Sequence, residues 1–442
     1  MMHTKRYLGA AAAATVAVSG LLLPTGAAFG AAGPCPGTDD TTNHIHKLSG
    51  DCQLTQTWVV DSGWTIRGGG HTITVAPGFT GPVIASVPGT NGVAPPSMTV
   101  ENVTIDATGS SGPHIVGVLF DGAAGAVHGV TISGVSSGTA GENGYGVEAD
   151  NSVGADFTAS QVKIDRGTTI SGYQRAAIYA HGDLKLSVLR ATIGSPDAIG
   201  GQDVAGVLAS DGVHGSIKEN HVSLTDTEPA TAGSYSAGVQ IIGDPTTNRR
   251  IEVKRNVFTG TDADFGISVE NPAQAFKMTA AVDCNLFSRN DSSATDPFGV
   301  GVGAWDGPKS NVQLGNSTFK GNWNQPSGNV SGTNVTPGTV NNLRTATSTC
   351  PPGAPTHVRA VGGNHRIKVT WRAAVAPDYA PLTDYRVKAK RKGHPAISKT
   401  VGPNATSAVL KGLKNNRSYV VTVQARSNGG KASASDRVRT HR

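Results

Sequence analysis

A short apolar segment that begins with glycine or alanine recurs along the chain at a nearly constant interval. It reads GVLF at 117, GVEA at 146, AIYA at 177, GVLA at 206, GVQI at 238, GISV at 266 and GVGA at 301. The intervals are 29, 31, 29, 32, 28 and 35 residues, and a second strand-like segment follows each copy. Because one such coil cannot bury its apolar side alone, a period near thirty without helical patterns predicts a stacked β-solenoid.

Strand alternation assigns the two faces of each repeated segment. Two inward columns follow, and we expect glycine at the strand start to permit sharp corners between faces. An internal ladder of stacked amide side chains is also expected. The first inward column is Val118, Val147, Ile178, Val207, Val239, Ile267 and Val302, the second is Phe120, Ala149, Ala180, Ala209, Ile241, Val269 and Ala304, and the ladder is Asn220, Asn256, Asn285 and Asn316.

The outward positions of adjacent coils concentrate polar side chains. Neighbouring coils place Cβ atoms about 5 Å apart and diagonal neighbours about 7–8 Å apart. Asp121 with Asp150 suits the carboxyl separation of about 5–5.5 Å in retaining glycosidases, whereas Asp121 with Glu148, or Asp150 with Asp183, suits the separation of about 6.5–9.5 Å in inverting ones. We therefore take Glu148, Asp150 and His181 as candidate catalytic residues, with His181 as an alternative base for proton abstraction. The candidate substrate-binding residues are Asp121, Tyr179, Asp183, Asp211 and Trp305, of which Tyr179 and Trp305 are expected to offer flat faces for stacking on sugar rings.

The same residues also have a purely structural interpretation. The stretch SDGVHG at 210–215 fits a tight turn between two strands, because turns favour Asp and Gly. Carboxylates on a solenoid face also discourage edge-to-edge association. The cluster around Glu148 is therefore either a site or a solvated face.

The N-terminus and the cysteines indicate export. Residues 1–32 have a basic start, an apolar run and small residues, as in a secretory signal peptide, and no membrane span is expected elsewhere. Four cysteines allow three pairings, of which we expect Cys35–Cys52 and Cys284–Cys350. No CxxC spacing points to a metal. We predict a secreted protein, extracellular or associated with the cell surface.

The period, the G-V-x-A strands and the N-x-F/V strands resemble the right-handed parallel β-helix proteins of the pectate-lyase-like superfamily, over roughly residues 40–345. This resemblance implies an all-β solenoid, here placed at residues 33–350. It does not fix the reaction, because the superfamily includes hydrolases, lyases and adhesins. The polygalacturonase motifs are absent from the coils, since RIK lies at 366–368 and TDD at 38–40. We also see no pectate-lyase constellation of calcium ligands and arginine, so no cofactor or metal is predicted.

A second domain is expected at residues 351–442. A proline-rich entry and alternating strands resemble a fibronectin type III β-sandwich, with Tyr419 placed to form a tyrosine corner. From Pro351 onward the chain holds 18 Lys and Arg but 3 Asp and Glu, whereas residues 1–350 hold 19 Lys and Arg and 28 Asp and Glu. A basic exported module is suited to an anionic glycan or wall polymer, although the charge is also compatible with mere solubility. The matching residues are Pro355, Val358, Trp371, Tyr385, Val387, Leu413, Tyr419, Val423 and Ala425.

These observations favour a secreted protein that binds and cleaves a polysaccharide, as a glycoside hydrolase or, as a variant, a polysaccharide lyase. The alternative is a non-catalytic surface or adhesion protein that binds glycan or cell wall. No nucleic-acid partner is expected. An enzyme predicts a cleft walled by the loops 134–145, 225–237 and 289–300, whereas an adhesin predicts a smooth face.

Overall fold

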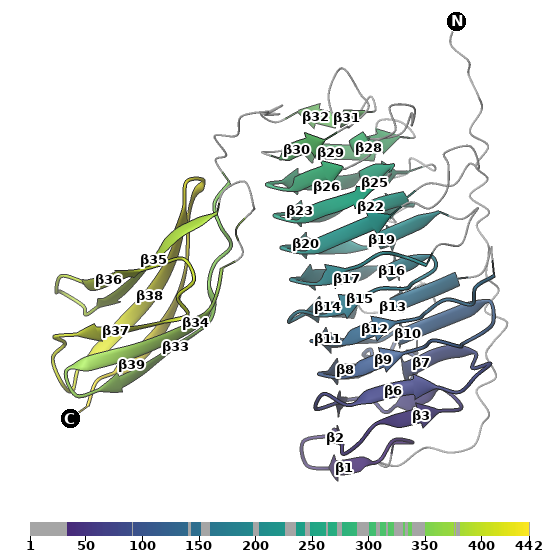
Figure 1. Ribbon diagram of the computed structural model, residues 1–442, viewed down its shortest axis with the longest axis horizontal. Coiled ribbons are helices and arrows are strands. Elements are labelled where there is room, and N and C mark those ends of the chain that lie inside the picture. The colour runs from purple at the N-terminus through teal and green to yellow at the C-terminus, as the bar shows by residue number, and fades with distance from the viewer. Residues whose placement is uncertain are drawn as a thin grey trace, which may run out of the picture.

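Every regular element of the described chain is a β-strand, and most of them stack into a parallel β-helix (Figure 1). The computed structural model describes residues 33–441 except 91, 140–142, 152–159, 198–202, 226–235, 244–247, 262–263, 272–275, 290–299, 306–309, 315–316, 322–329, 332–334, 338–349, 375 and 377–380. The predicted signal peptide lies outside the described residues. Among the residues described, no helix is long and apolar enough to cross a membrane.

Three sheets, here called A, B and C, form the sides of the β-helix, and each coil passes from sheet C to A to B. Sheet A contains β1 (Gly37–Asp40), β2 (Ile45–Leu48), β5 (Trp64–Arg67), β8 (Ser97–Glu101), β11 (Ala124–His128), β14 (Ser160–Asp165), β17 (Leu184–Leu189), β20 (His214–Lys218), β23 (Arg249–Lys254), β26 (Met278–Asp283), β29 (Ser310–Leu314) and β32 (Val335–Pro337). Sheet B contains β3 (Cys52–Leu54), β6 (Thr72–Val75), β9 (Thr104–Asp106), β12 (Thr131–Ser133), β15 (Thr169–Ile170), β18 (Thr192–Ile193), β21 (His221–Thr225), β24 (Val257–Thr261), β27 (Leu286–Arg289) and β30 (Thr318–Gly321). Sheet C contains β4 (Trp58–Val60), β7 (Gly81–Ser86), β10 (His114–Asp121), β13 (Asn143–Asn151), β16 (Ala176–Gly182), β19 (Val204–Ser210), β22 (Ser236–Ile242), β25 (Phe265–Glu270), β28 (Val300–Trp305) and β31 (Val330–Ser331).

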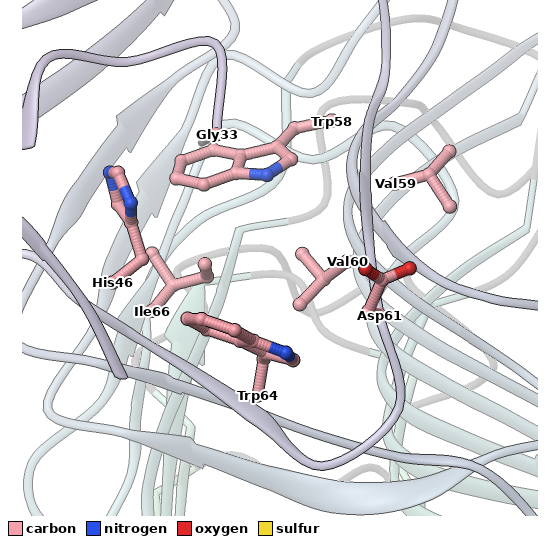
Figure 2. A pocket seen from close by; sticks show the side chains of 8 residues that line it. All are labelled: Gly33, His46, Trp58, Val59, Val60, Asp61, Trp64 and Ile66. Atoms are coloured by element: carbon pink, nitrogen blue, oxygen red, sulfur yellow. The ribbon is translucent and has the colours of Figure 1, made fainter. Parts of the chain in front are cut away.

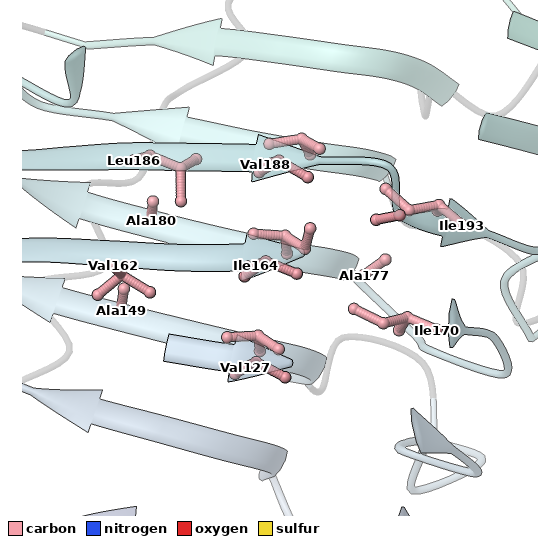
Figure 3. Close-up of a cluster of buried hydrophobic side chains, with 14 of the residues drawn as sticks. Val127, Ala149, Val162, Ile164, Ile170, Ala177, Ala180, Leu186, Val188 and Ile193 are labelled. Carbon is pink, nitrogen blue, oxygen red and sulfur yellow. The ribbon is translucent and has the colours of Figure 1, made fainter. Parts of the chain in front are cut away.

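The core of the solenoid is the pair of aliphatic columns predicted from the repeat. Val118, Val147 and Ile178 are direct neighbours in the register of sheet C, and all three are fully buried. The columns from sheets A and B meet them from the other sides, so Val127, Ile164 and Val188 also lie one above another (Figure 3). Each coil thus covers the apolar edge of its neighbour, which confirms the predicted fold class.

The repeated glycine has a different cause from the one that the sequence predicts. Gly117 and Gly146 lie inside β10 and β13 rather than at a corner, and neither has a positive φ. A Cβ on Gly117 would lie 2.6 Å from the carbonyl oxygen of Gly146, and one on Gly146 would lie 2.6 Å from that of Ala177. The expectation of sharp corners is therefore wrong. Glycine is used because successive backbones and the buried sheet B side chains approach too closely for a side chain.

The predicted asparagine ladder runs along the corner between sheets A and B. The Asn256 side chain donates to Asn285 Oδ1 at 3.0 Å and accepts from the Asn220 side chain at 2.9 Å, and all three residues are buried. Ser317 continues the column by accepting from the Asn285 backbone N–H at 3.3 Å, whereas Asn316 lies outside the described residues. The ladder provides partners for backbone groups that the turn leaves unpaired inside the core.

The two ends of the solenoid are tied by disulfides with the expected pairing. Cys35 bonds to Cys52 beside β1, which pairs antiparallel with β2 and closes the N-terminal end of sheet A. Cys284 bonds to Cys350, the residue before the second domain.

The segment after Cys350 runs along the corner between sheets A and B, toward the N-terminal end of the solenoid. Arg190, Glu219, Arg255 and Cys284 occupy the same left-handed corner position in successive coils, with φ of 56–59°. After the disulfide at Cys284, Gly353 packs on the Glu219 carboxylate.

Arg190 then bonds to the segment one coil lower, donating to Thr356 Oγ1 at 2.7 Å and to the Ala354 carbonyl at 3.2 Å. The second domain is therefore attached along three coils rather than at one point.

The second domain is an antiparallel sandwich of a three-stranded and a four-stranded sheet. Trp371, Tyr385, Val387 and Val423 belong to its buried core, as the sequence predicts. The Tyr419 hydroxyl accepts a hydrogen bond from the Lys414 backbone N–H at 2.9 Å, which is the tyrosine corner. The sheets are β33 (Thr356–Gly363), β34 (Arg366–Arg372) and β37 (Ser407–Lys411), then β36 (Ile397–Val401), β35 (Leu382–Lys390), β38 (Ser418–Ser427) and β39 (Gly430–Arg439).

Candidate functional site

The outer face of sheet C brings the predicted polar residues together on four neighbouring coils. In the register of β10, β13, β16 and β19, Asp121 pairs with Asp150, Asp150 with His181, and His181 with Ser210. A second column places Glu148 beside Tyr179. Parallel strands lie about 4.8 Å apart, so each of these side chains neighbours the next.

His181 is held between two carboxylates from the coils on either side. Its Nδ1 lies 3.3 Å from Asp150 Oδ1 and its Nε2 lies 2.7 Å from Asp211 Oδ2, and 26% of the side chain is exposed. Burial lowers the pKa of His181, but the hydrogen bonds with Asp150 and Asp211 outweigh it and raise the pKa to about 9. His181 is therefore an imidazolium at neutral pH, and a role as general base would require alkaline conditions.

Glu148 is covered and already paired. Its Oε2 lies 2.6 Å from His114 Nε2, and 6% of the Glu148 side chain is exposed. Burial lowers the pKa of His114, whereas its hydrogen bond with Glu148 raises it, and the net direction is upward. His114 was not among the residues predicted from the sequence. Its position at the start of the repeated strand was the available signal, since it lies one coil before Glu148 on the same face.

Asp121 lies in surroundings that favour its protonated form. Burial raises its pKa first, and the charges of Asp150 and Glu148 raise it further. The sequence placed Asp121 among the binding residues, but this environment gives it the character of a proton donor. A neighbouring pair in which one carboxyl has a raised pKa and the other faces an imidazolium is the arrangement of general acid and nucleophile.

Three aromatic rings stack along the same face. Tyr145 lies on Tyr179 with centroids 4.8 Å apart, and Tyr179 lies on His181 at 5.9 Å. Burial raises the pKa of Tyr179 to about 12, so its hydroxyl stays protonated. Because both faces of the Tyr179 ring are covered, it offers an edge and a hydroxyl to a sugar rather than the flat face that the sequence analysis expected. Tyr145 itself is buried and was missed.

The other predicted binding residues lie in different surroundings. The Asp183 carboxylate is 2.5 Å from Arg249 Nη2, an ion pair that joins the corners between sheets C and A. Asp211 occupies a left-handed corner position, with φ of 53°, and reaches back to His181. Trp305 ends β28 and pairs with Glu270, far along the sheet from His181, and its side chain lies outside the described residues.

The expected walls of a cleft fall largely outside the described residues, which omit 140–142, 226–235 and 290–299. A small hollow is present elsewhere, at the N-terminal end, where Trp58, Trp64 and His46 line it with Gly33 packed over Trp58 (Figure 2). Within the described part of the chain, no group of three or more His, Cys, Asp or Glu side chains is arranged to hold a metal ion.

Comparison with known proteins concerns the second domain. Residues 351–441 match the family model of the fibronectin type III domain. A structure described as a myokine matches at 23% identity and a TM-score of 0.18, over 21% of this chain and 99% of that one. The FN1–FN3 domains of chicken CNTN1 match at 21% identity and a TM-score of 0.19, over 21% of this chain and 33% of that one. The FN5 domain of Drosophila Lar matches at 20% identity and a TM-score of 0.18, over 21% of this chain and 98% of that one.

No curated protein matches the chain significantly. The family match agrees with the antiparallel sandwich and the tyrosine corner of Tyr419. The chain therefore consists of a parallel β-helix followed by a fibronectin type III domain at residues 351–441.

Proposed function

We propose that the protein is an exported glycoside hydrolase that binds a polysaccharide along the outer face of sheet C. The observation that carries this proposal is the neighbouring pair Asp121 and Asp150, in direct register on β10 and β13. Adjacent strands are about 4.8 Å apart, which suits the carboxyl separation of about 5–5.5 Å used by retaining enzymes.

In this mechanism Asp121 is the general acid and Asp150 the nucleophile. The Asp150 carboxylate forms a bond to the anomeric carbon while the glycosidic C–O bond breaks, and the Asp121 proton passes to the leaving oxygen. Asp121 then takes a proton from water, whose oxygen displaces Asp150 and frees the sugar. His181 is a positioning residue, because its imidazolium faces Asp150 and is fixed from the far side by Asp211.

The lyase variant is less well supported. Elimination needs an unprotonated base beside the carbon that carries the acidic hydrogen. His181, the base that the sequence proposed, is protonated at neutral pH because two carboxylates hold it. In the proposed hydrolase, by contrast, His181 acts in its protonated form, as the partner of Asp150.

A non-catalytic glycan-binding role is the second candidate. The observation that favours it is that Glu148 and His181 are both engaged in ion pairs, so they serve the face as structural groups. The edge and hydroxyl of Tyr179, backed by the buried ring of Tyr145, then contact a glycan that lies along this face.

The test is a panel of neutral and acidic polysaccharides incubated with the purified protein, with reducing ends and unsaturated products measured separately. We expect reducing ends without unsaturated products, and loss of at least 100-fold in rate in Asp121→Asn and in Asp150→Asn. The control is Glu252→Gln, which removes a carboxylate on sheet A that pairs with Lys218. Binding without any product favours the second candidate, and unsaturated products favour the lyase.

A further inference from the structure

The outer face of the four-stranded sheet in the second domain gathers positive charge on a floor of hydroxyl and amide groups. Along β35 the inward residues Tyr385, Val387 and Ala389 are buried, which turns Arg386, Lys388 and Lys390 outward. Alternate residues of a strand lie about 6.6 Å apart, so these three cations form a regular row.

The far side of the same face carries a second group of cations on β39. Arg437 lies opposite Val420, which lies opposite Lys390, so the two rows are separated by the width of β38. Lys431, Arg437 and Arg439 are exposed on this strand.

The floor between the two rows is polar and aliphatic. Thr422 and Ser435 share a hydrogen bond of 2.9 Å, and Gln424 donates to Ser433 at 3.3 Å. The described outward residues of β35, β38 and β39 include no aromatic ring.

Negative charge on this domain is neutralised or turned away. Asp384 pairs with Arg426 at 2.6 Å, and Asp436 accepts from the backbone N–H of Ala360 at 2.8 Å. These are the acidic side chains that the structure describes between 351 and 441. Asp384 lies on the outward side of β35 but is paired with Arg426, so neither carboxylate is paired with the six cations of the two rows.

We propose that this face, here called the cationic face, binds an anionic polysaccharide whose repeating groups are carboxylates. The rows of Lys and Arg attract the carboxylates, and the hydroxyl and amide floor matches sugar hydroxyls. Single-stranded nucleic acid is a poorer fit, because its binding sites combine positive charge with exposed aromatic stacking platforms.

This inference goes beyond the proposed hydrolysis and does not depend on it. The residues up to 350 contain 28 Asp and Glu against 19 Lys and Arg, so a polyanion is repelled from the solenoid as a whole and attracted to the second domain. The cationic face therefore acts as an attachment site that holds the protein on an acidic matrix, whatever glycan sheet C handles.

The experiment measures retention of the full chain on immobilised polygalacturonate at increasing salt. We expect retention that weakens as salt rises, and at least a tenfold loss of affinity in the triple variant Arg386→Gln, Lys388→Gln, Lys390→Gln. The matched control is Arg366→Gln, Lys368→Gln, Lys411→Gln, which removes the same charge from the other sheet of the domain. It should change affinity less than threefold.

Three results would overturn the proposal. One is no retention on polygalacturonate, and another is an equal loss in the two triple variants, which would reduce the effect to net charge. The third is equal or tighter binding to polyphosphate or double-stranded DNA. Retention is measured without any cleavage assay, so failure of this inference is distinguishable from failure of the proposed hydrolysis. Circular dichroism and the melting temperature check that both variants are folded.

Discussion

Arg190, at a corner of the solenoid, donates a hydrogen bond of 2.7 Å to Thr356 at the start of the fibronectin type III domain. The same guanidinium donates from Nε to Glu219 at 2.8 Å, and Arg255 pairs with Glu219 from the opposite coil. A single carboxylate thus holds two arginines, one of which holds the neighbouring domain.

Removing the Glu219 carboxylate should loosen this junction. Its side chain is 5% exposed, so Glu219→Gln leaves two arginines without their counter-charge in a covered position. We expect a loss of about 3 kcal/mol in the free energy of unfolding, measured by urea titration of the solenoid transition. Glu252→Gln breaks a more exposed ion pair and should cost less than about 1 kcal/mol. Equal costs in the two variants would show that the junction contributes nothing special.

The ion pairs of His181 make its contribution to stability depend on pH. The pKa of His181 is raised from 6.5 to about 9, so its stabilisation is complete below pH 6.5 and is lost as pH rises through 9. The difference in unfolding free energy between the wild type and His181→Gln should fall by on the order of 3 kcal/mol between pH 6 and pH 10. A difference that does not change with pH would contradict the paired arrangement.

The ionised Asp121 carboxylate should lower the free energy of unfolding at neutral pH. Its folded-state pKa is raised by burial and by Asp150 and Glu148, so the folded state disfavours the ionised form. Asp121→Asn should therefore raise the unfolding free energy at pH 7 and leave it nearly unchanged at pH 3, where both states are protonated. Thermal unfolding at the two pH values measures this. An Asp121→Asn variant that is less stable than the wild type at pH 7 would contradict the idea that the folded state disfavours the ionised carboxylate.

The asparagine ladder should be a major support of the solenoid corner. Asn256→Ala removes the bonds to Ile217, Asn220 and Asn285 and leaves buried groups without partners. We expect a cost of about 3 kcal/mol or more in unfolding free energy, because each unsatisfied buried group costs about 1–3 kcal/mol. The control Asn43→Ala, at an exposed turn, should change stability by about 0.5 kcal/mol or less. Similar small costs at both positions would show that the ladder is dispensable.

The close contact at Gly146 predicts that adding a methyl group at this position destabilises the protein, although the next coil carries one at the equivalent position. Gly146→Ala places a methyl group against the Ala177 carbonyl and Ile170, whereas Ala177 already carries a methyl group at the equivalent position one coil later. Overpacking should cost Gly146→Ala about 1–3 kcal/mol, measured by urea unfolding. Ala177→Gly should cost about 1 kcal/mol. A neutral or stabilising Gly146→Ala would show that the coils are spaced more widely than in this structure.

Much of the fold follows from a local rule that repeats. A strand period of two and a coil period near thirty are enough to predict that Val147 lies between Val118 and Ile178, and the register of sheet C confirms it. The same rule placed Asp121, Asp150 and His181 in one column, because equivalent positions of successive coils must stack. Glycine was different. The spacing of the glycines is visible in the sequence. The reason for them is the close approach of a backbone carbonyl from the next coil, and no local sequence pattern reveals that contact.

The sequence by itself determined which side chains share a face, since alternation and repeat length are properties of the chain alone. Only the tertiary structure decided their chemical state. His114 reaches Glu148 from the coil before it, Asp211 reaches back to His181 from a corner, and both contacts depend on how far each coil is rotated and how deeply each group is covered. Protonation and exposure are set by these surroundings, because desolvation and neighbouring charge act through space and not along the chain.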